Sequence, residues 1–477
     1  MLKIRRRTEA LGRSPRYNAP GMTSTTLADE PGRKPTADVI YRLDDRPPWT
    51  EAAVAAIQHV LAVFVGIVTP PLLIAGALGL ELRDASYVVS MSLLVSGVAT
   101  LIQVRRLGPI GSGLLSVQGT SFSFLGPIIA AGTAVTAAGG GTDAALAAVF
   151  GVCLVGSFVE IGLSRVLGFA RRLITPLVTG TVVTLIGLTL IRVGIEAMCG
   201  GPAARGDGTF ASPQNLGLAL LVLVVLVVLN FSSRNGLRMS SIIIALAVGY
   251  AASALLGRVD FGRLAELDLF AWPVPFRFGL GFSWAALPPI ALIYLITAIE
   301  TIGDLTGTSA VSGEPIEGEV YVERIRGGVL GDGVNSLLAA VFNTFPNTTF
   351  SQNNGVIQLT GVASRHVGYL VALFLAVLGL FPVVGGLFQI MPPAVLGGAT
   401  IVLFGTVAAA GIRILAGAEL DRRAMLILAV SLALGLGVTF VPEALDRLPA
   451  AVRSLLGSGI ATGGLCALAL ELLLPRR

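Results

Sequence analysis

Charge is scarce in this sequence. Only 13% of its 477 residues are charged, whereas 54% are hydrophobic and the mean hydropathy is +0.83. An ordinary soluble domain carries about 25% charged residues, so this composition excludes one. Apolar runs of about 20 residues, the length that crosses a bilayer as a helix, recur from residue 52 onward and lack the alternation of barrel strands. The sequence therefore predicts an integral membrane protein built from helices.

Cysteine and histidine are also rare. The three cysteines, Cys153, Cys199 and Cys466, have neither metal-ligand nor paired spacing. We therefore expect no disulfide, no metal and no cofactor. An intramembrane enzyme would need a nucleophile with its base, or a metal cluster, and the sequence displays neither. We expect that the protein is not an enzyme.

The first 50 residues differ from the rest, because they are basic, rich in Pro, Ser and Thr, and lack an early apolar block. They predict a disordered cytoplasmic tail (residues 1–50) and not a signal peptide. With this tail in the cytoplasm, most arginine-bearing loops fall on the same side, although Arg258, Arg263 and Arg277 do not. We predict a multi-pass protein of the plasma membrane, the bacterial inner membrane, with both termini cytoplasmic. The net charge of +5 is explained by orientation and does not indicate a nucleic acid partner.

Polar loops divide the remaining chain into about fourteen candidate segments. They lie near residues 52–80, 86–104, 109–131, 143–164, 173–195, 215–232, 240–256, 285–309, 327–345, 346–362, 366–390, 392–412, 424–441 and 454–474. The fifth and the twelfth, ITPLVTGTVVTLIGLTLIRVGI and MPPAVLGGATIVLFGTVAAAGI, align without a gap, so that Gly180 meets Gly397. Their places in the order differ by an odd number, so the copies run in opposite directions. That pattern indicates an inverted repeat, as in secondary transporters, with chance similarity as the alternative.

The third and tenth segments are interrupted. LLSVQGTSFSFLGPIIA (114–130) and FPNTTFSQNNGVIQLTG (345–361) place Gly, Pro and polar side chains at membrane depth. Such backbone is tolerated only where protein or a water-filled cavity surrounds it. Paired interruptions therefore indicate a substrate site, with ordinary kinks as the alternative. We expect half-helices that begin near Gly119 and Gly355 and point free N–H groups at a ligand.

Glu300, Asp304 and Asp332 place carboxyl groups inside the predicted segments. Glu300 and Asp304 share one helical face, and Asp332 lies in the ninth segment. Each costs roughly 2.5–3.5 kcal/mol on insertion scales, so a function is expected. Proton coupling is the first interpretation, and a structural hydrogen-bond network is the alternative. For His59, in the first segment, a hydrogen bond between helices is the first interpretation.

Several stretches together carry a resemblance to a known family. QNNGVIQLTG resembles the signature of the nucleobase-ascorbate transporters, and FPNTTFSQNNGVIQLTGVASR resembles their purine-specific branch. AIETIGDLTGTS, VQGTSFSF and the early QHVL match in kind and order. The resemblance covers nearly the whole chain after the tail.

The resemblance implies a fold and an assembly. The fold is an all-α membrane protein with fourteen transmembrane segments in two inverted repeats of seven, and short strands in the third and tenth. Residues 51–172 and 285–390 would form a core domain, and residues 173–284 and 391–477 a gate domain. A homodimer would work by an elevator-like step.

The resemblance also assigns residues to the substrate. Glu300 would bind the N–H groups of a purine ring, and Gln352 its other polar edge. Phe350 would stack on the base, and Ser121 with Phe122 would offer backbone contacts opposite. A glutamine amide donates and accepts in one plane, so it suits a base edge.

Supporting roles follow from the same resemblance. Asn353 would hold the tenth segment at the substrate, and His59 would organise the site from the first segment. Asp304 and Asp332 would support proton coupling and the core.

The function implied is import of xanthine, uric acid or both by proton symport, with sodium coupling left open. A uracil or other nucleobase symporter is one alternative, although such members tend to have Glu at the position of Gln352. An anion or bicarbonate transporter of the same fold is another. A carboxylate at position 300 would repel an anion, and this disfavours the second alternative.

Overall fold

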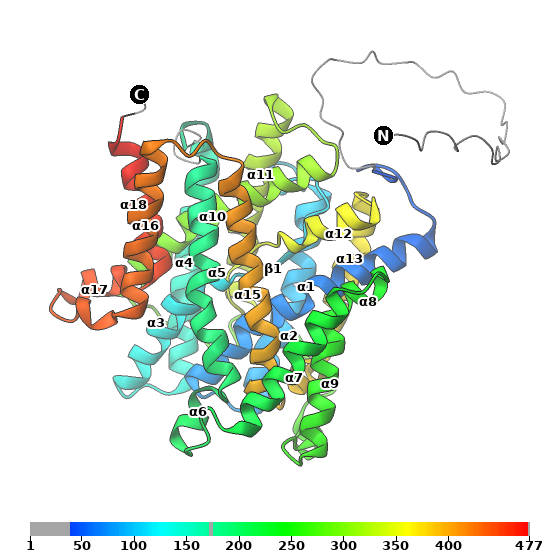
Figure 1. Cartoon of the computed structure of the whole chain (residues 1–477), viewed down its shortest axis with the longest axis vertical. Coiled ribbons are helices and arrows are strands. Elements are labelled where there is room, and N and C mark those ends of the chain that lie inside the picture. Colours follow the sequence, from blue (N-terminus) through cyan, green and yellow to red (C-terminus); the bar gives the residue numbers. More distant parts are fainter. Residues whose placement is uncertain (1–38, 171–174, 476–477) are drawn as a thin grey trace, which may run out of the picture. The chain divides into compact units, whose positions relative to one another are not determined.

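The computed structural model describes residues 39–170 and 175–475, which form a mostly helical protein (Figure 1). The α-helices are α1 (Trp49–Leu78), α2 (Leu82–Arg105), α3 (Leu125–Ala137), α4 (Thr142–Ala170), α5 (Pro176–Met198), α6 (Gly201–Gly206), α7 (Pro213–Asn230), α8 (Asn235–Met239), α9 (Ser241–Leu255), α10 (Leu287–Val311), α11 (Gly318–Val341), α12 (Gln352–Thr360), α13 (Arg365–Gly379), α14 (Pro382–Gln389), α15 (Pro393–Ala416), α16 (Arg422–Phe440), α17 (Ala450–Leu456) and α18 (Gly459–Leu473). The 3₁₀ helices are η1 (Phe122–Phe124), η2 (Phe261–Glu266) and η3 (Pro442–Leu445), and the strands are β1 (Gln118–Thr120) and β2 (Asn347–Thr349).

Length and composition identify the helices that suit a membrane. Among the described residues, eight helices are long and apolar enough to cross one, namely α1, α2, α4, α5, α7, α10, α15 and α16. The pair α13 and α14, bent by 73°, adds a ninth if it forms one span. The prediction of a helical, multi-pass membrane protein is therefore confirmed. Every predicted segment coincides with a described element, but that all of them cross the membrane stays a prediction.

The two interrupted segments meet in a two-stranded antiparallel sheet. Gln118 of β1 lies opposite Thr349 of β2, and every residue of both strands is buried. Short strands therefore stand where the resemblance implied them. Strand pairing satisfies backbone groups that a lone extended segment would leave unpaired in a membrane.

The helical parts of these segments begin later or earlier than predicted. Gly119 lies inside β1, and helix begins only at Phe122; Gly355 lies inside α12, which already begins at Gln352. The helices thus begin three residues from these glycines, and neither glycine is itself the first residue of a helix. A Cβ on Gly119 would come within 2.6 Å of the Phe350 ring. Gly119 is required for close packing between the segments and not for a helix start.

Helices α5 and α15, which hold the two aligned segments, pack on each other over their length (Figure 1). A Cβ on Gly180 would come 2.7 Å from the side chain of Leu415, and one on Gly397 would come 2.2 Å from the backbone nitrogen of Met198. The contacts run in opposite directions along the two helices, so the helices are antiparallel. In the gapless alignment Gly180 corresponds to Gly397, and by the same spacing Met198 corresponds to Leu415. A two-fold rotation that superposes the two helices therefore exchanges the contact of Gly180 with Leu415 and the contact of Gly397 with Met198. This pair has the geometry of an inverted repeat, and its extension to seven segments each stays a prediction.

The chain before α1 is bound to the turn after α12. Tyr41 and Val362 form a parallel bridge, the Ala363 N–H donates to the Tyr41 carbonyl at 2.8 Å, and the Arg365 N–H donates to the Leu43 carbonyl at 2.9 Å. The Tyr41 hydroxyl donates to Glu51 at 2.8 Å, and this hydrogen bond raises the pKa of Tyr41. The predicted tail thus ends too late, because residues 39–50 are ordered by these contacts. Residues 1–38 lie outside the described residues.

Two groups of helices can be distinguished by their packing. Helices α5, α7, α9, α15, α16 and α18 pack largely on one another, whereas α2 packs on α1, α11 and α13, and α4 on α10 and α11. Helix α10 also contacts α5 and α18 of the first group. The division into a core domain and a gate domain at the predicted boundaries stays a prediction.

Candidate functional site

Glu300 lies where the third segment meets α10. Helix α10 packs against η1, β2 and α12, which are all parts of the interrupted segments. Glu300 is half-buried, and the Ser123 hydroxyl donates to its Oε2 at 3.3 Å. Ser121 caps η1, since its hydroxyl accepts from the Ser123 N–H at 3.3 Å. Sequence reasoning named Ser121 but missed Ser123, the second hydroxyl of the same SFSF stretch.

Asp304, one turn further along α10, is bound by the tenth segment. The Thr349 hydroxyl donates to Asp304 Oδ2 at 3.0 Å. Beside it, the Thr308 hydroxyl donates to Asn354 Oδ1 at 2.7 Å, and the Asn354 amide donates to the Asp304 carbonyl at 3.4 Å. The structure therefore fixes α12 to the helix that carries both acids. Asn354 is a site residue to which sequence reasoning gave no role.

Asp332 is fully buried in α11 and bound by donors from two other helices. Its Oδ1 accepts from the Gln103 side chain of α2 at 3.0 Å, and its Oδ2 accepts from the Thr301 hydroxyl of α10. Gln103 is itself oriented by the Ser112 N–H, which donates to its Oε1 at 2.7 Å. These contacts are those of the structural network that was the alternative for this acid, and a role of Asp332 in coupling stays a prediction.

The start of α12 carries the other predicted residues. Gln352 is the first residue of the helix and is half-buried, and the Asn353 amide donates to the Leu115 carbonyl at 2.5 Å. His59 is fully buried on α1, and the side chain of Asn353 faces it. The structure therefore brings His59, Asn353 and the third segment together, as a role in organising the site requires.

The two aromatic residues have contacts of their own. Phe350 is buried, with its ring against Gly66 of α1 and Gly119 of β1. Phe122 meets the ring of Phe404 on α15 edge-on, with centroids 5.3 Å apart. The Ser121 N–H donates to the Pro346 carbonyl at 2.9 Å, so in this conformation that donor is already used.

Sequence reasoning did not consider Glu160, an acid inside the predicted fourth segment. Glu160 lies in α4 and is fully buried, and α4 packs against α10 and α11, the helices that carry Glu300 and Asp332. The signal was present, because VCLVGSFVEIGL places a carboxyl in an apolar run. The same argument that identified Glu300 would have identified Glu160.

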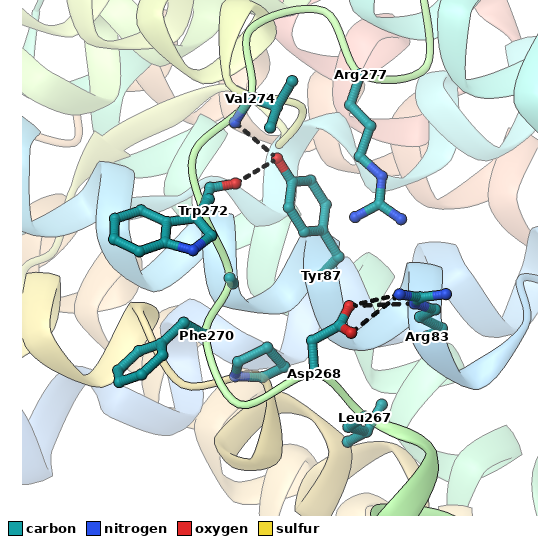
Figure 2. Close-up of a pocket in the computed structure, with 10 residues that line it drawn as sticks. Arg83, Tyr87, Leu267, Asp268, Phe270, Trp272, Val274 and Arg277 are labelled. Carbon is teal, nitrogen blue, oxygen red and sulfur yellow. Dashed lines mark hydrogen bonds and ion pairs between the residues drawn. The ribbon is translucent and has the colours of Figure 1, made fainter.

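A separate cavity of about 490 Å³ lies between the start of α2 and the loop after α9 (Figure 2). Arg83 forms an ion pair with Asp268 at 2.8 Å, and the Tyr87 hydroxyl donates to the Trp272 carbonyl at 3.2 Å. Arg277 lies over the Tyr87 ring, 4.1 Å from its centroid. Glu300 and Gln352 do not line this cavity. Its arginines are engaged in fixing the loop to α2, and we assign the candidate site to the interrupted segments instead.

Comparison with known proteins finds relatives along most of this chain. The model of a family described as a permease family matches residues 50–444. The xanthine permease XanP of Escherichia coli is 50% identical over 460 residues, which are 95% of this chain and 99% of the relative. The uric acid permease PucJ of Bacillus subtilis is 35% identical over 426 residues, which are 88% of this chain and 92% of the relative.

A solved structure shares the fold. The transmembrane domain of the cyanobacterial bicarbonate transporter BicA matches with a TM-score of 0.58 and 16% identity, over 86% of this chain and 100% of that chain. At this identity the likeness concerns the fold alone. The family model matches most of the chain, and both permeases are similar to it over most of their length. These two findings establish the family. The chain belongs to this permease family, the nucleobase-ascorbate transporters that its QNNGVIQLTG motif resembles.

Proposed function

We propose that the protein imports a purine base, xanthine or uric acid, by proton symport. The observation that carries this proposal is the position of Glu300. Its half-buried carboxylate lies against η1 of the third segment, on a helix that also contacts β2 and α12 of the tenth. The names of the two relatives, a xanthine permease and a uric acid permease, support the substrate class.

Hydrogen-bond capacity supports the role of Glu300. A carboxylate has about four lone-pair positions, and Ser123 occupies one on Oε2. The remaining positions accept from adjacent N–H groups of a purine ring. Gln352, at the first turn of α12, pairs with the other polar edge through its amide, which both donates and accepts. Phe350, two residues earlier, supplies the ring that stacks on the base.

The movement proposed is an elevator-like step of the core domain against the gate domain within a homodimer. Phe122 of the third segment touches Phe404 of α15, a contact between these proposed domains. The substrate site and α10 belong to the core side, so this aromatic contact changes when the core moves. Symport requires the loaded carrier to hold one proton more than the empty carrier, so a proton enters the buried acids from outside together with the base and leaves them on the inside after the base.

Anion transport is the competing function, because the bicarbonate transporter BicA has the same fold. The acid at position 300 argues against it. An ionised Glu300 repels an anion, whereas a neutral xanthine offers it N–H donors. Uric acid as a monoanion requires Glu300 to be protonated when it binds.

The test is uptake of labelled xanthine and labelled urate by liposomes containing the purified protein, with and without an inward proton gradient. Accumulation that requires the gradient is expected, and competition between the bases gives the preference. Accumulation that follows a sodium gradient alone would contradict proton symport. Transport of labelled bicarbonate without transport of either purine would overturn the proposed substrate class.

A further inference from the structure

We propose that Glu160 is a positioning residue for coupling: it exchanges a proton during the transport cycle and thereby controls the charge of Glu300 and Asp332. This inference rests on the proposed function, because it concerns the coupling step of the same site. Its basis is a buried carboxyl group that the binding machinery described above does not use.

The surroundings of the Glu160 carboxyl are closed. The residue is 0% exposed in α4, and neither carboxyl oxygen has a hydrogen-bond partner within the described part of the chain. The ion pairs found there do not include it. An ionised carboxylate without partners is costly in an apolar interior, so this conformation suits a carboxyl that holds its proton. Asp332, by contrast, is bound by two donors.

Helix α4 packs against α3, α10 and α11. Helices α4 and α11 face each other at this level, because Gly333, next to Asp332, packs against Ile161, next to Glu160. The groups close enough to act on Glu160 are Glu300, Thr297 and Tyr294 from α10 and Asp332 from α11, while α3 has no titratable side chain.

The two hydroxyls among these groups are committed elsewhere. Tyr294 donates to the Cys153 carbonyl at 2.8 Å, and Thr297 lies within 3.1 Å of the Ile293 carbonyl. None of the facing groups is a cation. Burial and the charges of the neighbouring acids therefore act on Glu160 together, and Asp304 of α10 lies close enough to act on Glu300 and Asp332 as well.

Three acids without a cation among them cannot all be ionised at low cost, because their negative charges repel one another. Whether one of them binds a proton therefore depends on the protonation of the other two. When Glu300 is ionised and accepts the N–H groups of a purine, Glu160 keeps its proton. When the base has left on the inside, Glu160 releases this proton there, so the empty carrier returns with one proton fewer than the loaded carrier, as symport requires. Glu160 thus sets the pH at which Glu300 changes state, without touching the substrate.

The test compares Glu160→Gln with Glu319→Gln, which changes an exposed carboxyl at the start of α11. Uptake of labelled xanthine is measured against pH, together with exchange of labelled for unlabelled xanthine at equal pH on both sides. Glu160→Gln is expected to keep exchange within about twofold of wild type while its uptake loses most of the pH dependence. Glu319→Gln keeps both. A wild-type pH profile in Glu160→Gln would overturn the inference.

A second readout does not depend on transport. The infrared difference spectrum of the wild-type protein between acidic and alkaline pH should contain a C=O stretching band of a protonated carboxyl that Glu160→Gln lacks. An unchanged spectrum would also overturn the inference. If Glu160→Gln fails to insert, Glu160→Asp keeps a titratable group and must shift the pH profile of uptake. Absence of purine transport in the wild type would instead remove the proposed function, and the spectrum would still decide whether Glu160 exchanges a proton.

Discussion

The hydroxyl of Ser123 donates a hydrogen bond to the carboxylate of Glu300 at 3.3 Å, across 177 residues of sequence. The contact joins the first interrupted segment to the helix that carries the acids. Helix α10 then continues to Asp304, which Thr349 of the second interrupted segment binds in turn. Two acids of one helix therefore each accept a hydrogen bond from a different interrupted segment.

Replacement of Glu300 by Gln is expected to abolish proton-driven accumulation of xanthine. The amide keeps the shape of the side chain but loses the charge that accepts N–H donors, worth about 1.5–3 kcal/mol, or about tenfold or more in affinity. Initial rates and steady-state accumulation are measured in the same liposomes. Glu319→Gln, at an exposed position on α11, is the matched control. Normal accumulation by a fully inserted Glu300→Gln protein would exclude Glu300 from the mechanism.

Replacement of Gln352 by Ala is expected to weaken purine binding about tenfold or more. A side chain that pairs bidentately with a base edge contributes about 1–3 kcal/mol of recognition. Gln358→Ala provides the control, because Gln358 lies exposed on the same short helix. Binding of xanthine to each purified variant is measured by calorimetry. Equal affinities of the two variants would show that Gln352 does not contact the substrate.

Replacement of Thr301 by Val is expected to destabilise the fold by about 1–3 kcal/mol, because it removes a donor from the buried Asp332 carboxylate. Thr406→Val is the matched control, since the exposed Thr406 hydroxyl only donates to the Val402 carbonyl of its own helix. Thermal unfolding in detergent should show a lower Tm for Thr301→Val only. Identical Tm values would mean that Asp332 does not depend on this donor.

Replacement of Gly187 by Ala is expected to separate α5 from α15. An added Cβ would come 2.2 Å from the backbone nitrogen of Ala408, and overpacking of this kind costs about 1–3 kcal/mol. Gly405→Ala on α15 is the control, because its Cβ would meet nothing within 4 Å and alanine favours a helix. The Tm in detergent is the measurement. A Gly187→Ala protein as stable as Gly405→Ala would contradict the close contact.

The alignment of the fifth and twelfth segments shows what could be predicted from the sequence. It required the two copies to be antiparallel, and α5 and α15 are antiparallel with exchanged contacts at Gly180 and Gly397. That the two helices pack directly on each other did not follow from the alignment, because a repeat relates two elements by symmetry without placing them in contact.

The interrupted segments show which structural details could not be predicted from the sequence. Gly, Pro and polar side chains marked both correctly, but the helix starts, expected near Gly119 and Gly355, lie three residues from them. A glycine permits a backbone break and equally permits close packing, and only the neighbouring Phe350 ring shows which applies at Gly119. Ser123, Gln103 and Thr301 were missed for a related reason, since a hydroxyl or amide in an apolar run has no local signature of the acid it binds.

The sequence by itself determined the class of the protein and the identity of its polar segments. Lipid tolerates only apolar surfaces whose backbone polar groups are hydrogen-bonded. Membrane helices, their interruptions and the acids inside them can therefore be recognised from local composition. The tertiary structure decided the partners: β1 with β2, Ser123 with Glu300, and Gln103 with Asp332. These contacts join elements far apart in the chain, and which of them meet depends on packing that no local spacing encodes.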